Sequence, residues 1–237
     1  MKLVPAKTPE LVKSIFPSFV WNIKTEEKIL FLTFDDGPTP GVTDWVLELL
    51  ENYNAKATFF CIGKNIESHP ELFERIISQG HSIGNHTYNH LKGWKTKTND
   101  YLKDVELTEH VIKDKLQNAT SKNNNDTSWN LEIEDCDLNL FRPPYGKLKS
   151  NQSKALQALG YKIILWDVLS FDWDVTISEK DCLDNVLSSA QKGSIIVFHD
   201  SLKAQRNLKF ALPRVLEHFS KKGFDFKSIN EISPSQK

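Results

Sequence analysis

Two adjacent carboxylates close a short apolar run near the start of the chain. Asp35 and Asp36 follow Phe34 and precede Gly37 and Pro38, residue types that favour a turn. Neighbouring carboxylates repel each other unless a positive group lies close to them. The pair therefore indicates either an ordinary Asp-Gly turn or a site where one acid binds a cation and the other handles a proton.

Two histidines supply the ligand types that would complete such a cation site. His86 and His90 would lie on one face of a helical turn, where both rings can reach one ion. Taken alone, the pair fits two surface or capping histidines equally well. With one carboxylate added, the set leaves coordination positions open for water and substrate. These ligand types favour Zn2+, although they do not exclude other divalent ions.

A bound divalent cation would give the two adjacent acids separate roles. One acid would coordinate the ion, and its neighbour would stay free to take a proton from the metal-bound water. Such a cation brings the pKa of bound water from about 15.7 towards about 7, so a carboxylate base is adequate at neutral pH. The predicted cofactor is therefore one divalent metal ion, and the chemistry is hydrolysis.

Other groups suited to catalysis follow later apolar runs. Arg142 could orient the free carboxylate, or form a surface ion pair of little energy. Tyr145 precedes Gly146 and could offer a backbone N–H to a developing oxyanion, or simply pack in a loop. His199 ends the apolar run SIIVF and could act as a general acid, although a histidine at that position also fits a satisfied core residue.

Alternating apolar runs and amphipathic stretches indicate the elements that position these groups. Strands are predicted at 29–34, 57–62, 81–84, 138–142, 162–168, 194–199 and 224–226. Helices are predicted at 42–52, 70–79, 100–116, 150–159, 178–190 and 208–221. The alternation predicts an α/β fold with a distorted (β/α) barrel of about seven parallel strands in a single domain.

Parallel α/β folds gather functional groups at the carboxyl ends of their strands. The groups named above are therefore predicted to meet at one end of the barrel. Asp167, Asp172 and Trp173, at or just after the end of the fifth predicted strand, are expected at the same end.

The remaining sequence sets the context of this domain. Residues 1–27 are read as an N-terminal extension with a short helix capped by Thr8, and residues 118–137 as a polar surface insertion with a hairpin around 129–133.

The net charge of −1 does not indicate a surface that binds nucleic acid, and no apolar run approaches the ~20 residues that span a bilayer. The three cysteines favour reduced, buried thiols. A cytoplasmic location is expected, because the first residues do not resemble a secretory leader.

Five motifs give the chain a family resemblance. TFDDGP, HTYNH, FRPPYG, FDW and VFH occur in the order and spacing of the polysaccharide deacetylases, carbohydrate esterase family 4, over residues 28–226. The resemblance identifies residues 28–237 as a NodB-homology catalytic domain. It implies a distorted (β/α) barrel and metal-dependent removal of an N-acyl group, usually acetyl, from an amino-sugar oligo- or polysaccharide.

The resemblance also implies roles for the residues at matching positions. Asp35 would be the catalytic base, and Arg142 would tether it. The metal ligands would be Asp36, His86 and His90.

The remaining implied roles concern the acid and the substrate. His199 would be the general acid, with Asp172 tuning its charge. The backbone of Tyr145 would help to bind the oxyanion, and the acyl methyl would lie against Trp173 and Val197.

The fourth motif departs from the family pattern. Many members carry an additional Asp three residues before the Asp-Trp pair, where this chain has Leu169. The departure bears on substrate choice and on the partner of His199, but not on the metal ligands or the base.

Other functions remain open on the sequence alone. One is a non-catalytic carbohydrate-binding protein on the same fold, and another is an intracellular deacylase or deformylase of a lipid-linked amino sugar. A glycosidase with paired carboxylates is disfavoured, because adjacent acids cannot flank a glycosidic bond. The particular sugar, the acyl group and the oligomeric state are not defined by these residues.

Overall fold

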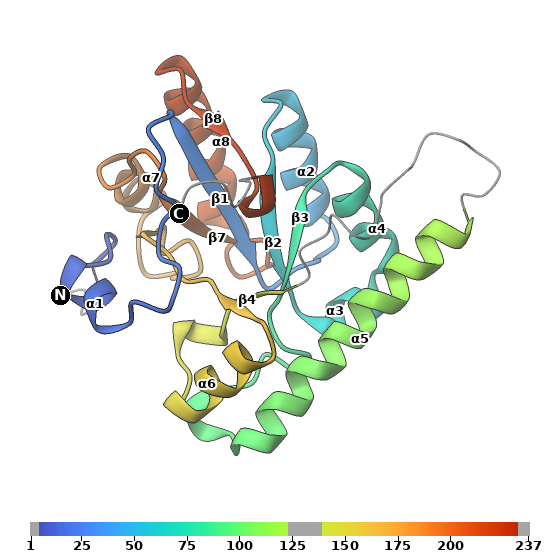
Figure 1. Ribbon diagram of the computed structural model, residues 1–237. Helices are drawn as coiled ribbons and strands as arrows, with labels where there is room; N and C mark the ends of the chain where they lie inside the picture. Colours follow the sequence, from blue (N-terminus) through green and yellow to red (C-terminus); the bar gives the residue numbers. More distant parts are fainter. Residues whose placement is uncertain (1–4, 123–138, 232–237) are drawn as a thin grey trace.

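Strand β1 (Ile29–Asp35) forms the centre of the sheet because both of its faces bury apolar side chains. Phe31 packs in an inner cluster shared by several strands. Leu32 and Phe34 point the other way and pack against the helices outside the sheet. A nearly continuous apolar run is what burial on two faces requires, and the hydroxyl of its one internal polar residue, Thr33, is hydrogen-bonded. The computed structural model describes residues 5–122 and 139–231 (Figure 1).

The sheet is parallel throughout and curls into an open half-barrel. Its order is β5-β4-β3-β2-β1-β7-β6, and β8 pairs with the beginning of β1. The strands after β1 are β2 (Ala57–Cys61), β3 (Ser82–Asn85), β4 (Leu140–Phe141), β5 (Lys162–Ile163), β6 (Val168–Leu169), β7 (Ile195–His199) and β8 (Asp225–Phe226). The predicted α/β fold, with parallel strands in a single distorted barrel, is confirmed.

Helices surround the outer side of this curved sheet (Figure 1). They are α2 (Thr43–Asn52), α3 (Gly63–Ser68), α4 (Pro70–Ser78), α5 (Thr98–Lys122), α6 (Ser150–Ala158), α7 (Glu179–Leu187) and α8 (Gln205–Lys221). The short helix α1 (Glu10–Ile15) belongs to the N-terminal segment and buries none of its side chains. Helix α5 continues beyond its predicted end at 116, into the start of the predicted insertion. The hairpin predicted around 129–133 lies outside the described residues. Within the described ranges, no helix has the length and apolarity needed to cross a membrane.

The prediction of one continuous strand over 162–168 is wrong. This run forms two short strands, β5 and β6, which lie at opposite ends of the sheet. The residues between them find a partner in the N-terminal segment: the Val20 N–H donates to the Ile163 carbonyl, and the Leu165 N–H donates to the Val20 carbonyl. At β6, the Leu169 N–H donates to the Ala6 carbonyl. The N-terminal segment therefore pairs across the opening of the half-barrel.

Charged side chains tie this N-terminal segment to the barrel. The ammonium groups of Lys7 and Lys13 lie 2.5 and 2.7 Å from the two carboxylate oxygens of Asp167, which also accepts from the Ser194 hydroxyl. Asp167 precedes β6, so it lies at the amino end of that strand. Its predicted place among the groups at the carboxyl ends is wrong.

Helix α1 forms in this segment without its predicted cap. The Thr8 hydroxyl donates to the Trp166 carbonyl at 2.8 Å, and Pro9 occupies the N-cap position. Thr8 therefore joins the N-terminal segment to the barrel and does not cap the helix. Elsewhere, Cys61 and Cys182 are buried free thiols, as predicted for these two cysteines.

Candidate active site

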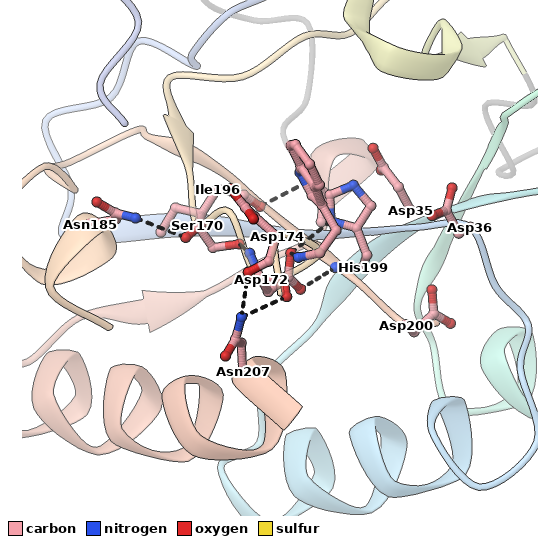
Figure 2. A network of polar contacts seen from close by, with 12 residues as sticks. Asp35, Asp36, Ser170, Asp172, Asp174, Asn185, Ile196, His199, Asp200 and Asn207 are labelled. Carbon is pink, nitrogen blue, oxygen red and sulfur yellow. Dashed lines mark hydrogen bonds and ion pairs between the residues drawn. The ribbon is translucent and has the colours of Figure 1, made fainter. Parts of the chain in front are cut away.

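The register of the two central strands brings the predicted base and acid together. Asp35, the last residue of β1, pairs with His199, the last residue of β7. Figure 2 shows the His199 ring between Asp172 on one side and Asp35 and Asp36 on the other. The carboxyl ends of the strands therefore collect the predicted site, as expected for a parallel sheet.

Asp36, His86 and His90 form one compact cluster. The Nε2 atoms of His86 and His90 lie 3.6 and 3.2 Å from the same Asp36 Oδ1 atom. The three ligand atoms lie within 4.8 Å of one another. Within the described part of the chain, this buried Oδ1 atom has no hydrogen-bond partner. A divalent cation is the kind of group that an orphaned carboxylate oxygen facing two imidazoles fits.

The ionisation of the cluster suits a cation. The Nδ1 atom of His86 contacts the Arg142 carbonyl at 2.8 Å, which assigns the proton to Nδ1 and leaves Nε2 as a ligand. Burial lowers the pKa of His86 to about 4, so this ring is neutral at physiological pH. Burial would raise the pKa of Asp36, but the neighbouring histidines, His90 first, lower it well below its usual value.

The two histidines meet through a loop and not through the helical turn predicted from their spacing. Thr87 and His90 have φ angles of 64° and 54°, in the left-handed region that costs non-glycine residues energy. Asp104 of α5, which is buried, holds this loop. Its carboxylate accepts from the backbone N–H groups of Tyr88 and Asn89 at 2.9 Å and from the Asn89 amide at 2.6 Å.

Asp104 is a site-building residue that the sequence reading missed. The sequence could have indicated it, because Asp104 lies on the same helical face as Tyr101, Val105 and Thr108, which are buried. These positions recur with helical spacing on one face, so a charge among them requires a specific partner.

Arg142 is fully buried and crosses the interior of the half-barrel. Its Nη1 atom donates to Asp35 at 2.6 Å and to the Thr33 hydroxyl at 2.7 Å. Its Nε and Nη2 atoms donate to the carbonyls of Ile164 and Leu165. The alternative interpretation of Arg142, a surface ion pair, is therefore wrong. Removing one partner of such a buried pair costs about 3–5 kcal/mol.

His199 is held by a carboxylate on its far side. Asp172 accepts from the His199 backbone N–H at 2.7 Å and contacts its Nδ1 atom at 2.8 Å. Burial would lower the pKa of His199, but the Asp172 charge and hydrogen bond outweigh it and raise the pKa to about 9. The Asn207 amide of α8 donates to the Asp172 carbonyl (Figure 2). With Leu169 in the fourth motif, His199 still has Asp172 as its partner.

Tyr145 lies beside His90, one of the three candidate metal ligands. It is 50% exposed, and its ring centroid lies 4.8 Å from that of His90. Its φ of 61° places it in the left-handed region. The Gly146 N–H donates to the Pro143 carbonyl. An oxyanion donor in this loop is therefore expected to be the Tyr145 N–H and not that of Gly146.

The two residues predicted to face the acyl methyl lie close to His199 in the fold. Val197 is fully buried in β7, two residues before His199, so both side chains share one face of the strand. Trp173 is half-buried, and its backbone N–H donates to Asp172.

Asp200, the residue after β7, positions the turn that carries Asp36. It accepts from the Gly37 N–H at 3.0 Å and from the Thr43 hydroxyl at 2.6 Å. A Cβ atom on Gly37 would lie 1.9 Å from the Asp200 carboxylate, so only glycine fits there. Asn65 adds a 2.7 Å bond to the Asp36 carbonyl. Burial raises the pKa of Asp200 to about 8.

Comparison with known sequences shows which proteins this chain is similar to. The sequence model of the family described as Polysaccharide deacetylase matches residues 22–164. A peptidoglycan-N-acetylglucosamine deacetylase of Bacillus cereus is 31% identical over 90% of this chain and 91% of its own length. The peptidoglycan-N-acetylmuramic acid deacetylase PdaA of Bacillus subtilis is 30% identical over 88% of this chain and 72% of its own length.

Solved structures share the fold as well. The Bc1960 peptidoglycan N-acetylglucosamine deacetylase superposes with a TM-score of 0.78 at 27% identity, over 94% of this chain and 96% of that one. BA3943 of Bacillus anthracis, described as a pseudoenzyme, superposes with a TM-score of 0.71 at 20% identity, over 89% of this chain and 67% of that one. The second likeness shows the fold alone.

Proposed function

The chain belongs to the polysaccharide deacetylase family, and from this premise we propose that it is a metal-dependent hydrolase of N-acetyl groups on amino sugars. The proposed substrate is a glycan of the peptidoglycan class, on which the related enzymes named above act. One observation carries the proposal: a metal-ligand cluster lies beside a tethered carboxylate and an imidazole held by a second carboxylate.

The cation would be held by Asp36, His86 and His90, and Zn2+ is the ion that this ligand set favours. When bound, it supplies Lewis-acid polarisation and makes water a better nucleophile. Asp35 takes the proton of the attacking water, because Arg142 and the strand register hold its carboxylate in place.

His199 supplies the proton that the leaving amine needs. A pKa near 9 keeps its ring protonated at neutral pH, and Asp172 fixes the ring by its Nδ1 atom so that Nε2 remains the donor. The Tyr145 N–H would stabilise the oxyanion, and Val197 and Trp173 would face the acyl methyl.

A non-catalytic role is the second candidate, because the same fold includes the pseudoenzyme BA3943. The observation against it is the complete set of ligands, base and acid in this chain, each with its supporting contacts.

Paired substitutions of the adjacent acids test the proposal. Asp35→Asn should reduce acetate release from an N-acetylglucosamine oligomer or peptidoglycan fragment by at least about 100-fold, while one equivalent of metal stays bound. Asp36→Asn should lose the metal and the activity together, because it removes a ligand. Metal content by plasma emission spectrometry and acetate release by enzymatic assay check both outcomes.

Asp114→Asn on α5 is the matched control, since this carboxylate is exposed. It should leave both readouts unchanged. An Asp35→Asn variant with most of its activity would refute the assignment of the base. Wild-type protein that binds metal but releases no acetate from any N-acetylated glycan would favour the binding role.

A further inference from the structure

An exposed aromatic pair, Trp94 and Tyr145, lies beside His90 of the proposed metal site. Trp94 is 38% exposed, and its ring packs edge-on against Tyr145 at a centroid distance of 5.4 Å. Tyr145 in turn contacts the ring of His90. Exposed aromatic rings beside a catalytic centre offer a surface on which a neighbouring part of the substrate can stack.

Two lysines place positive charge on this aromatic pair. The Lys92 Nζ atom lies 5.5 Å from the Tyr145 ring centroid, and the Lys147 Nζ atom lies 5.9 Å from the Trp94 ring centroid. Within residues 5–122 and 139–231, no carboxylate forms an ion pair with either ammonium group. The whole chain carries a net charge of −1. The local positive charge is therefore a property of this surface and not of the protein as a whole.

The backbone under the pair is held in place before any ligand arrives. The buried Gln152 amide donates to the carbonyls of Gly93 and Thr96, and the Lys149 ammonium also donates to the Thr96 carbonyl. A Cβ atom on Gly93 would lie 3.0 Å from Gln152 and from the Lys147 backbone, so the two loops pack without space between them. The backbone positions of Trp94 and Lys147 are therefore coupled, so ligand binding need not order the backbone of this subsite.

We infer that Lys92, Trp94, Tyr145 and Lys147 form a subsite for a carboxylate-bearing residue next to the amino sugar that is deacetylated. The aromatic pair would receive a sugar ring, and the two ammonium groups would receive its acidic substituent. The inference rests on the proposed function and specifies its substrate: an anionic glycan is preferred over a neutral oligomer of N-acetylglucosamine. Partly exposed ion pairs are weak individually, so the preference should be modest and salt-sensitive.

Three substrates separate charge from ring stacking. They are a peptidoglycan fragment with free carboxylates, the same fragment with its carboxylates amidated, and a neutral N-acetylglucosamine oligomer. The double variant Lys92→Gln/Lys147→Gln should raise KM for the free-carboxylate fragment about threefold to tenfold, with kcat within twofold of wild type. KM for the other two substrates should not change, and 0.5 M NaCl should remove most of the wild-type preference.

Lys222→Gln is the matched control. Lys222 is an exposed lysine that follows α8, where its carbonyl accepts from Lys28 at the amino end of β1, opposite the site. It should change none of the three KM values. Equal KM changes on all three substrates, or no change on any, would overturn the inference.

Calorimetric binding of the free and amidated fragments to wild type and the double variant keeps this test separate from the proposed function. If no acetate is released from any substrate, the proposed function fails, and the binding data still decide the charge preference. A loss of affinity confined to the free-carboxylate fragment supports the subsite. Equal affinities of wild type and the double variant for that fragment refute it.

Discussion

At the scale of single residues, the site depends on pairs in which one side chain fixes the chemistry of another. Arg142 holds Asp35, and Asp172 holds His199. Asp104 and Asp200 carry no proposed chemistry, yet they hold the backbone from which the proposed metal ligands project. Buried carboxylates with satisfied hydrogen bonds are suited to this work, because a partner lost in a low-dielectric interior is costly.

The Asp172–His199 pair predicts a specific change in the pH profile. The pKa of His199 is raised above its ordinary value, so the acid form is present at low and neutral pH and is lost as pH rises through about 9. Asp172→Asn removes the main charge that raises this pKa. The alkaline limb of kcat/KM should therefore move to lower pH by at least about one unit, with a fall of about 10–100-fold in kcat.

The neighbouring Asp174→Asn variant serves as the control for that profile. The Asp174 carboxylate accepts from the Thr176 N–H and hydroxyl, whereas the pKa of His199 is raised by Asp172, Asp36 and Asp35, so the alkaline limb should stay where it is in wild type. An alkaline limb that does not move in Asp172→Asn would show that another group sets it.

At the scale of elements, the half-barrel is completed by the segment that precedes its first strand. Residues 6–22 form backbone hydrogen bonds near both edge strands, and Asp167 gathers Lys7, Lys13 and Ser194 at the amino end of β6. Unpaired strand edges expose backbone donors and acceptors, so covering them is a general need of open sheets. The N-terminal segment is therefore part of the framework that supports the carboxyl-end site.

Asp167→Ala should destabilise the protein without altering its chemistry. Asp167 is buried, and its removal takes a partner from Lys7, Lys13 and the buried Ser194 hydroxyl. Lys13 keeps Glu10 and Lys7 keeps the Ser189 carbonyl, so the free energy of unfolding should fall by about 1–3 kcal/mol. Urea titration measures the loss, and kcat of the folded variant should equal that of wild type. Lys180→Met is the control, because the Lys180–Asp184 pair is exposed to solvent and its loss should leave the free energy of unfolding as in wild type.

The same network predicts an acid dependence of stability. Burial would raise the pKa of Asp167, but hydrogen bonds from Lys13, Lys7 and Ser194 lower it. Its stabilisation is then fully present above the unfolded value of about 3.9 and is lost as pH falls through the folded value. Asp167→Ala should reduce the loss of stability measured between pH 5 and pH 3. An identical loss in wild type and variant would contradict this role.

Particular residues show what the sequence could and could not predict. The seven buried residues of β1 and the regularly spaced apolar positions of α4 and α8 were readable, because burial on defined faces leaves a period in the sequence. The residues 162–168 were misread, because an apolar run does not reveal that its two ends pair at opposite edges. The positions of His86 and His90 were readable, but not the left-handed loop that joins them, since a distant carboxylate on α5 holds it.

At the scale of the whole molecule, the proposed metal binding would be linked to folding. A cation that binds the folded cluster and not the unfolded chain stabilises by about 2.7 kcal/mol at a free concentration 100 times its Kd. For a chain of this length that corresponds to a rise in Tm of roughly 5–10 °C. Metal-stripped protein titrated with Zn2+ in a calorimeter should show this rise, and Asp35→Asn should keep it. Asp36→Asn should not, and an equal rise in that variant would place the metal elsewhere.

The pairing of residues 6–22 with the strands at the open edge has a consequence for the order of folding. These residues leave the ribosome before any strand of the sheet, yet their partners in the barrel lie far later in the chain, 160 and 154 positions later in the contacts of Lys7 and Lys13 with Asp167. Contacts so distant in sequence form slowly, because the chain between them must first be ordered. During synthesis this segment must therefore stay unpaired until its partners around Asp167 have been made. Closure of the edge is therefore as long-range in sequence as the central pairing of β1 with β7.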